Sequence, residues 1–196
     1  MTPNELKSLV FETVTAPSLA ARKVMAFDAP QAALWLGLIL MAALHGIYYG
    51  ILLPGAAKAG LVMPAMANAP LLIAGLLLSI FVVMAYLMAM SGRLLGGVGD
   101  FAAMMKVTIW LQAMRLLAQV VISTLSLISP ALGWVAMMAV GLWGIFILLT
   151  FVATAHEFEV IKAVGVIVMT FFATIIVLST LMTVFGVATP PTTGGL

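Results

Sequence analysis

The sequence contains no cysteine and very little charge. The absence of cysteine excludes disulfides, cysteine-ligated metals and thiol catalysis. Charged residues make up only 7% of the 196 residues, whereas a soluble domain has about 25%. With only two histidines and six acidic residues, few groups remain for acid–base chemistry. Composition therefore argues against an enzyme, and we expect no cofactor.

Hydrophobic residues account for 65% of the chain and gather in five runs that carry almost no charge. Each run reaches the roughly 20 residues that cross a ~30 Å hydrocarbon core. We expect membrane spans at residues 32–53, 70–90, 104–129, 131–154 and 163–186. Pro130 separates the third span from the fourth at a tight hairpin. The predicted fold is all-α: a polytopic membrane protein with a five-transmembrane-helix bundle.

Residues 1–30 are amphipathic and do not form a span. Between Leu6 and Val14 the apolar residues recur at helical spacing, opposite polar residues that include Glu12. This pattern is typical of a helix lying in the membrane interface. Pro17 breaks the helix and begins a second short one, because proline suits a first helical turn. A partly ordered tail is the alternative.

The basic residues are distributed unevenly between the two sides of the predicted bundle. With the N-terminus cytoplasmic, that side collects Lys7, Arg22, Lys23, Arg93, Lys106 and Lys162. The opposite side holds only Lys58. Because short cytoplasmic loops are enriched in Lys and Arg, we expect a cytoplasmic N-terminus and an extracytoplasmic C-terminus. The bundle would then occupy residues 31–186, followed by a disordered extracytoplasmic tail at 187–196.

The third predicted span carries a polar seam at helical spacing, formed by Gln112, Arg115, Gln119, Ser123 and Ser126. Such a seam is costly against lipid, so it should face other helices or a wet crevice. No acidic residue lies within the five predicted spans, which argues against a carboxylate proton relay. Two interpretations remain open. Either Arg115 ties helix ends or binds lipid phosphate, or the seam is the pathway of a small transporter or channel.

The first predicted span carries small residues every fourth position, at Ala42, Gly46 and Gly50. A stripe of this kind lets a second helix approach closely. It predicts helix packing, either within the chain or across a dimer. His45 lies on the same span, where we interpret it as a hydrogen-bonded packing residue.

Two loops contain residues that chemistry might use. The first is rich in glycine, but no strand precedes it and no Lys-Ser/Thr follows it, so it is not a phosphate-binding loop. We interpret it as a sharp turn, with Asp100 as the N-cap of the next helix. The second holds His156, Glu157 and Glu159, yet Val160 occupies the place of the second histidine of a zincin motif. We therefore expect no metal site.

The same loops resemble the Yip family, named after Ypt/Rab-interacting proteins. Its pattern is an Arg-x-x-Gly-Gly-x-Gly-x-Phe loop after the second span, here Arg93–Phe101. A His-containing loop with Lys-Ala precedes the fifth span, here His156–Ala163, and the hairpin at Pro130 lies between them. The resemblance covers about residues 15 to 186. The Asp-Leu-Tyr-Gly-Pro-type motif of eukaryotic members is absent, which indicates a prokaryotic-type member in the bacterial inner (cytoplasmic) membrane.

The resemblance implies a non-enzymatic integral membrane scaffold or adaptor, for membrane organisation or as an accessory subunit of a larger complex. The expected partners are membrane lipids and other membrane proteins or a second copy, but not nucleic acid. A small transporter or channel using the Gln112, Arg115 and Gln119 seam is the alternative. The residues expected to form a cytoplasmic interaction rim are Arg93, Gly96, Gly97, Gly99, Asp100, Phe101, His156 and Lys162.

Overall fold

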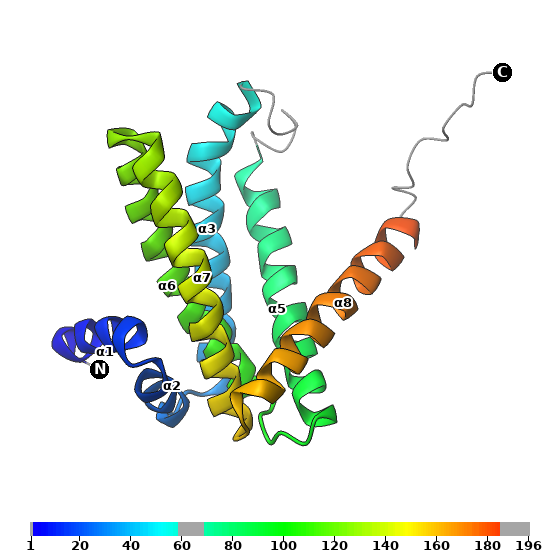
Figure 1. The fold of residues 1–196 in the computed structure, drawn as a ribbon. Coiled ribbons are helices and arrows are strands. Elements are labelled where there is room, and N and C mark those ends of the chain that lie inside the picture. Colours follow the sequence, from blue (N-terminus) through cyan, green and yellow to red (C-terminus); the bar gives the residue numbers. More distant parts are fainter. Residues whose placement is uncertain (1, 59–68, 185–196) are drawn as a thin grey trace.

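The computed structural model describes residues 2–58 and 69–184, and within these ranges all regular secondary structure is helical (Figure 1). The predicted tail at 187–196 lies outside the described residues. The helices are α1 (Pro3–Thr15), α2 (Pro17–Ala26), α3 (Gln31–Lys58), α5 (Pro70–Leu94), α6 (Phe101–Ile128), α7 (Pro130–His156) and α8 (Val160–Val184). The prediction of an all-α fold is confirmed.

Five of these helices, α3, α5, α6, α7 and α8, are long and apolar enough to cross a membrane. Each observed helix contains or closely matches one predicted span, with ends that differ by a few residues. The predictions fell short at most ends because the helices continue through polar residues. α5 extends through Arg93 and α7 extends to His156. The chain is a multi-pass membrane protein.

Proline and aspartate set several of the helix boundaries. Proline occupies the first turn of α1, α2, α5 and α7, where its missing N–H costs no intrahelical hydrogen bond. Asp100 caps α6, with its side-chain oxygen accepting the Ala103 N–H at 2.7 Å, as predicted. Pro130 begins α7 directly after Ser129, so α6 and α7 form the predicted hairpin.

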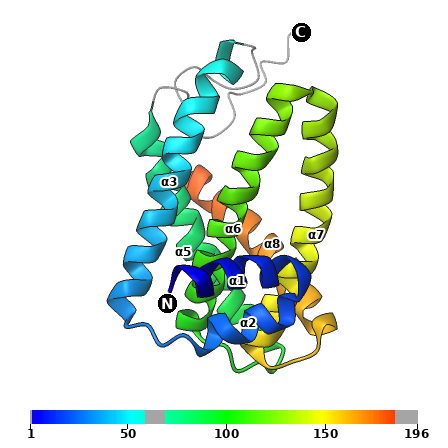
Figure 2. The same ribbon diagram turned by 90° about the vertical axis from the view of Figure 1, so that its left-hand side faces the viewer.

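The helices α3, α5, α6 and α7 stand side by side, whereas α8 leans away from them (Figure 1). α3 packs on α5 and α6, α6 packs on α7, and α8 packs on α5 and α7. We call the end where the α5–α6 and α7–α8 loops meet the loop end. Figure 2 shows α1 and α2 crossing in front of the bundle on the side of this end.

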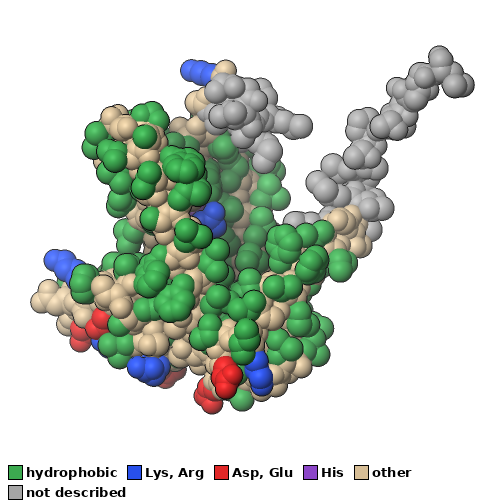
Figure 3. All heavy atoms as spheres, viewed as in Figure 1, with side chains coloured by type: hydrophobic (Ala, Val, Ile, Leu, Met, Phe, Trp, Pro, Cys, Tyr) green, Lys and Arg blue, Asp and Glu red, His purple; other side chains and the backbone are tan. Residues whose placement is uncertain are grey.

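The buried core lies toward the loop end. Fully buried side chains there include Met104, Met105 and Val107 of α6, and Phe151 and Val152 of α7. Elsewhere the helices expose apolar side chains, as a surface in contact with lipid requires. Figure 3 shows hydrophobic side chains over most of one face, with acidic side chains confined to the lower part.

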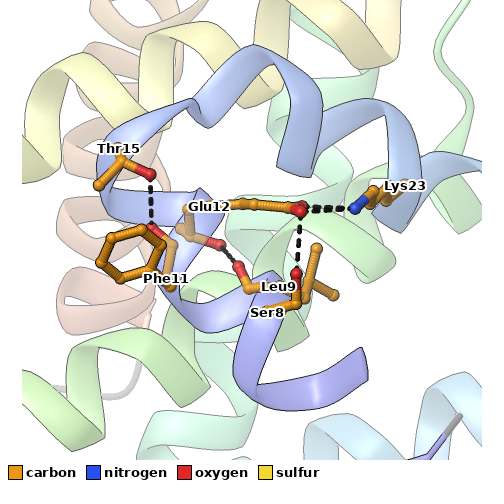
Figure 4. Close-up of polar contacts among 7 residues, drawn as sticks. Ser8, Leu9, Phe11, Glu12, Thr15 and Lys23 are labelled. Atoms are coloured by element: carbon orange, nitrogen blue, oxygen red, sulfur yellow. Dashed lines mark hydrogen bonds and ion pairs between the residues drawn. The ribbon is translucent and has the colours of Figure 1, made fainter. Parts of the chain in front are cut away.

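The short helices α1 and α2 are braced against each other and against the bundle. Lys23 Nζ contacts both carboxylate oxygens of Glu12, at 2.6 and 2.7 Å (Figure 4). The Lys23 hydrogen bond lowers the pKa of Glu12, which therefore stays ionised at neutral pH. Trp110 donates to Thr13 Oγ1 at 3.0 Å, and Trp143 donates to the Val14 carbonyl at 2.9 Å. The pair is thus fixed to α6 and α7.

Candidate functional site

The α5–α6 loop begins with a glycine in the left-handed conformation. Gly96 has a φ of +84°, which L side chains rarely adopt. Its N–H donates to the Arg93 carbonyl at 3.0 Å. The Gly97 N–H donates to the Gly92 carbonyl at 2.8 Å. Together these bonds form a Schellman motif, which ends α5 and satisfies carbonyls that the helix leaves unpaired.

His156, the last residue of α7, lies beneath this loop and not on the surface. Only 1% of the residue is exposed. The Gly99 N–H donates to the ring Nδ1 at 3.1 Å, joining residues 57 positions apart in the sequence. The Val98 N–H donates to the His156 carbonyl at 3.2 Å. Because Nδ1 accepts a hydrogen bond, the imidazole is neutral and carries its proton on Nε2.

The two faces of the His156 ring have different surroundings. The Phe158 ring stacks on it, with centroids 5.2 Å apart and planes 7° apart. The Met88 carbonyl of α5 is close enough to act on the ring electrostatically. No acceptor meets the geometric criteria for a hydrogen bond to Nε2 among the described residues. The stacked Phe158 ring and the hydrogen bond from Gly99 therefore hold the imidazole in place.

Three glycines leave the space that His156 occupies. A Cβ atom at Gly92 would overlap the imidazole ring. At Gly97 or Gly99 a Cβ would lie 2.7 Å from ring Nδ1, closer than such atoms approach in proteins. We call Gly92, Gly97 and Gly99 the glycine cradle. The cradle explains why a loop of glycines and a histidine occur together in this chain.

The end of α7 repeats the geometry of the end of α5 without a glycine. Glu157 has φ 55° and ψ 41°, in the left-handed region. Its N–H donates to the Thr154 carbonyl at 3.3 Å, and the Phe158 N–H donates to the Ala153 carbonyl at 3.1 Å. A side chain in this conformation costs about 1–3 kcal/mol. The turn directs the chain into α8 and leaves the Glu157 side chain exposed.

Above the buried histidine, the two loops present one exposed surface, which we call the rim. Its charged side chains are those of Arg93, Asp100, Glu157, Glu159 and Lys162. Its large apolar side chains are those of Leu94, Val98, Val160 and Ile161. Among the described residues, the only ion pair within 4 Å is Lys23–Glu12, so no rim charge forms an ion pair. The rim joins apolar surface to unpaired charge.

The residues expected in the rim divide into two groups. Arg93, Gly96, Asp100 and Lys162 are exposed, as a contact surface requires. His156 and Gly99 are buried, and Gly97 and Phe101 are half-buried. His156 therefore lies beneath the exposed residues of the rim.

Two further residues that shape the site, Gly92 and Phe158, were not expected from the sequence. Gly92 lies inside α5 and faces His156 of α7, so its role depends on how two distant helices pack. An interior helical glycine, which costs about 1 kcal/mol relative to alanine, was the available signal. No group of three or more metal-ligating side chains occurs in the described parts of the chain.

The polar seam of α6 is partly closed by α3. Tyr48 OH lies 2.7 Å from Ser123 Oγ, and Gln119 Nε2 donates to Tyr49 OH at 2.9 Å. Arg115 is exposed, and the side-chain oxygens of Gln112 and Gln119 are buried without a hydrogen-bond partner. The seam thus faces another helix along part of its length.

The small-residue stripe of α3 faces α5. A Cβ at Gly46 would lie 2.8 Å from Ala74 Cβ, and one at Gly50 would lie 3.2 Å from Pro70 Cβ. Ala42, on the same stripe, is buried. His45 is also buried, and its Nδ1–H donates to the Met41 carbonyl at 2.9 Å. The structure therefore places this stripe in packing within the chain.

Comparison with curated proteins and with solved structures gives no significant match. A sequence model of the Yip1 domain, in contrast, matches residues 11–182. The match includes α2, all five long helices except the last residues of α8, and both loops that meet at His156. Because it covers most of the chain, the protein belongs to the Yip1 domain family.

Proposed function

We propose that this membrane protein is a non-enzymatic scaffold or adaptor that contacts partner proteins through the rim. The observation that carries the proposal is the hydrogen bond from the Gly99 N–H to His156 Nδ1, which joins two loops far apart in the sequence into one surface. This hydrogen bond fixes the backbone of the two loops beneath the exposed side chains of the rim. A surface that is shaped in advance loses less entropy when a partner binds.

The composition of the rim supports a protein contact more than a lipid contact alone. Leu94, Val98 and Ile161 are 66%, 63% and 70% exposed. Next to them, Arg93 and Lys162 offer positive charge that no carboxylate within 4 Å neutralises. Apolar anchors with a charged edge are the usual anatomy of a protein interface. The partner is another membrane protein, a peripheral protein or a second copy.

We place the protein in a bacterial inner membrane, with the rim and the N-terminus on the cytoplasmic side. The charge distribution supports this orientation. Arg93, Lys106 and Lys162 lie at or near the loop end, whereas Lys58 ends α3 at the other end of the bundle. Basic residues near the ends of spans favour the cytoplasmic side.

Site-specific photo-crosslinking tests the rim in membranes of cells that make the protein. A photoreactive amino acid replaces Val98 or Ile161 in turn, and the matched control position is Leu127, which is 89% exposed near the end of α6 opposite the loops. We expect both rim positions to link to the same protein, and Leu127 not to link to it. The double change Arg93→Glu and Lys162→Glu should abolish this product without changing the midpoint of thermal unfolding.

Crosslinks that are the same at all three positions, or that survive the charge reversal, would refute the rim as the contact surface. A product of twice the chain mass would identify the partner as a second copy. The His156→Ala variant distinguishes the effect of the rim's shape on crosslinking from the effect of its charge. It should lose the crosslinks together with thermal stability, whereas charge reversal should lose the crosslinks alone.

The alternative function, transport through the seam, draws support from exposed Arg115 and from the unpaired oxygens of Gln112 and Gln119. Purified protein in liposomes provides the test, with wild type compared to Arg115→Leu. A solute flux that Arg115→Leu abolishes would favour a transporter or channel. The hydrogen bonds that join Ser123 to Tyr48 and Gln119 to Tyr49 favour packing, so we expect no flux.

A further inference from the structure

A pocket of about 620 Å³ lies between the N-terminal helix pair and the bundle, and no rim side chain lines it. On the bundle side, apolar side chains of α3 and α6 line it, including Leu34, Ile109 and Trp110. On the other side, Leu9 of α1 and Val24 and Phe27 of the α2 segment complete the apolar wall. Its size falls within the range of about 300–1,000 Å³ that is usual for ligand pockets.

Polar lining comes from Glu5, Ser8, Lys23 and Lys106. Ser8 Oγ donates to Glu12 at 3.0 Å, and Lys23 contacts the same carboxylate (Figure 4). Lys23 is therefore largely neutralised. Glu5 accepts the Thr2 N–H at 2.7 Å in a capping box, so its carboxylate serves α1.

Of the two lysines that line the pocket, Lys23 forms an ion pair with Glu12, whereas Lys106 has no acidic partner among the described residues. Its Nζ donates one hydrogen bond, to the Met25 carbonyl at 3.2 Å, so two N–H donors remain. Asp100 and Glu157 line a smaller neighbouring pocket of about 310 Å³ together with Lys106. Neither carboxylate comes within 4 Å of its ammonium group. A half-buried cation at an apolar pocket attracts an anionic group with an apolar body.

We propose that the pocket binds an anionic phospholipid of the surrounding membrane, with one acyl chain against Leu34, Ile109 and Trp110 and its phosphate at Lys106. The bilayer is the source, because Leu6 and Phe11 of α1 are exposed beside the pocket and suit a helix lying at a membrane surface. This site goes beyond the proposed rim, since none of the rim side chains lines it.

The charge of the site selects among lipids. An anionic headgroup such as phosphatidylglycerol carries net negative charge, which Lys106 stabilises. A zwitterionic headgroup carries its own ammonium group, which competes with Lys106 for the phosphate. We expect about a fivefold preference for the anionic lipid, the factor that one lysine near a membrane surface provides.

Photoactivatable phospholipids test this selectivity on the full-length protein. Phosphatidylcholine vesicles receive a small fraction of either phosphatidylglycerol or phosphatidylcholine with a diazirine in the acyl chain. Mass spectrometry of peptides then measures labelling of residues 33–37 and 106–110. We expect about five times more label from phosphatidylglycerol there, and a ratio near one at the exposed apolar residues Leu71 and Leu127.

Four variants separate site charge, general charge and volume. Lys106→Gln should reduce the ratio to about one, and Lys106→Arg should preserve it. Lys7→Gln removes an exposed charge from α1 outside the pocket and should leave the ratio unchanged. Ala33→Leu should reduce pocket labelling with both lipids, because Ala33 lines the pocket and a larger side chain fills it.

Two results would overturn the proposal. Equal labelling by both lipids at the pocket would mean that only ordinary surrounding lipid reaches it. Absence of label at residues 33–37 and 106–110, while Leu127 is labelled, would mean that protein fills the space. Either result would leave the crosslinking test of the rim intact, because the two experiments probe different residues.

Discussion

The two ends of the bundle are held together in different ways. At the loop end, the His156 ring fills the glycine cradle, and side chains of α6 and α7 are fully buried nearby. Toward the other end, the helices make polar contacts, such as Tyr48 with Ser123 at 2.7 Å, beside the close approach of Gly46 and Gly50 to α5. Apolar residues there are open to lipid, with Leu127 89% exposed. Most of the fully buried side chains therefore lie where the loops meet, whereas the other end exposes more of its apolar surface.

The largest predicted effect comes from Gly92→Ala. Its new methyl group overlaps the His156 ring, and overpacking of this kind costs about 1–3 kcal/mol. The midpoint of thermal unfolding in detergent should fall clearly. Gly75→Ala is the matched control, because it lies in the same helix with no atom within 4 Å of the added Cβ. The control should be neutral or stabilising. Equal losses of stability in the two variants would show that overlap with the His156 ring is not the cause.

A smaller effect of opposite sign is expected from Glu157→Gly. Glycine adopts the left-handed conformation of this turn without steric cost, so the variant should be about 0.5–1 kcal/mol more stable. Chemical unfolding in mixed micelles measures the change. Glu159→Gly removes the same charge outside the left-handed region, and it should lower stability. If both variants gained stability, charge and not backbone strain would be the cause.

At the other end of the bundle, Tyr48→Phe removes the hydrogen bond to Ser123 but keeps the ring. Hydrogen bonds between helices in membranes contribute about 0.6 kcal/mol on average, so the loss should be small. The same unfolding measurement applies, with Ser123→Ala and the double variant completing a cycle. A loss larger than that of Gly92→Ala would reverse the comparison between the two ends.

The smallest effect is a pH dependence of the brace between α1 and α2. The Lys23 hydrogen bond lowers the pKa of Glu12, so folding favours the ionised carboxylate. This contribution is complete above the ordinary pKa of a glutamate and is lost as pH falls through the lowered value. Spin labels on α1 and α2 should therefore move apart only in acid. In Glu12→Gln the distance should not depend on pH in that range.

Hydropathy and proline positions predicted the five spans, because burial in lipid demands about 20 apolar residues whatever the neighbouring helices do. Asp100 was predictable as a cap for a similar reason, since an N-cap depends on the adjacent residues alone. The cradle was not predictable. Whether His156 faces water or a glycine of α5 depends on contacts between helices far apart in the sequence. Arg115 likewise has a clear spacing, but its exposure follows only from the packing of α3 and α6.

Because α8 leans away from the other helices, it contacts the bundle mainly near the loop end (Figure 1). Among the α8 side chains whose burial the structure describes, the buried ones are Ala163, Val166 and Thr170, in the first half of the helix. At 1.5 Å per residue, the 25 residues of α8 span about 37 Å. Its contacts with the bundle therefore concentrate in the half that begins near His156. A change of about 10° in the tilt of α8 at this end would therefore move its far end by about 6 Å.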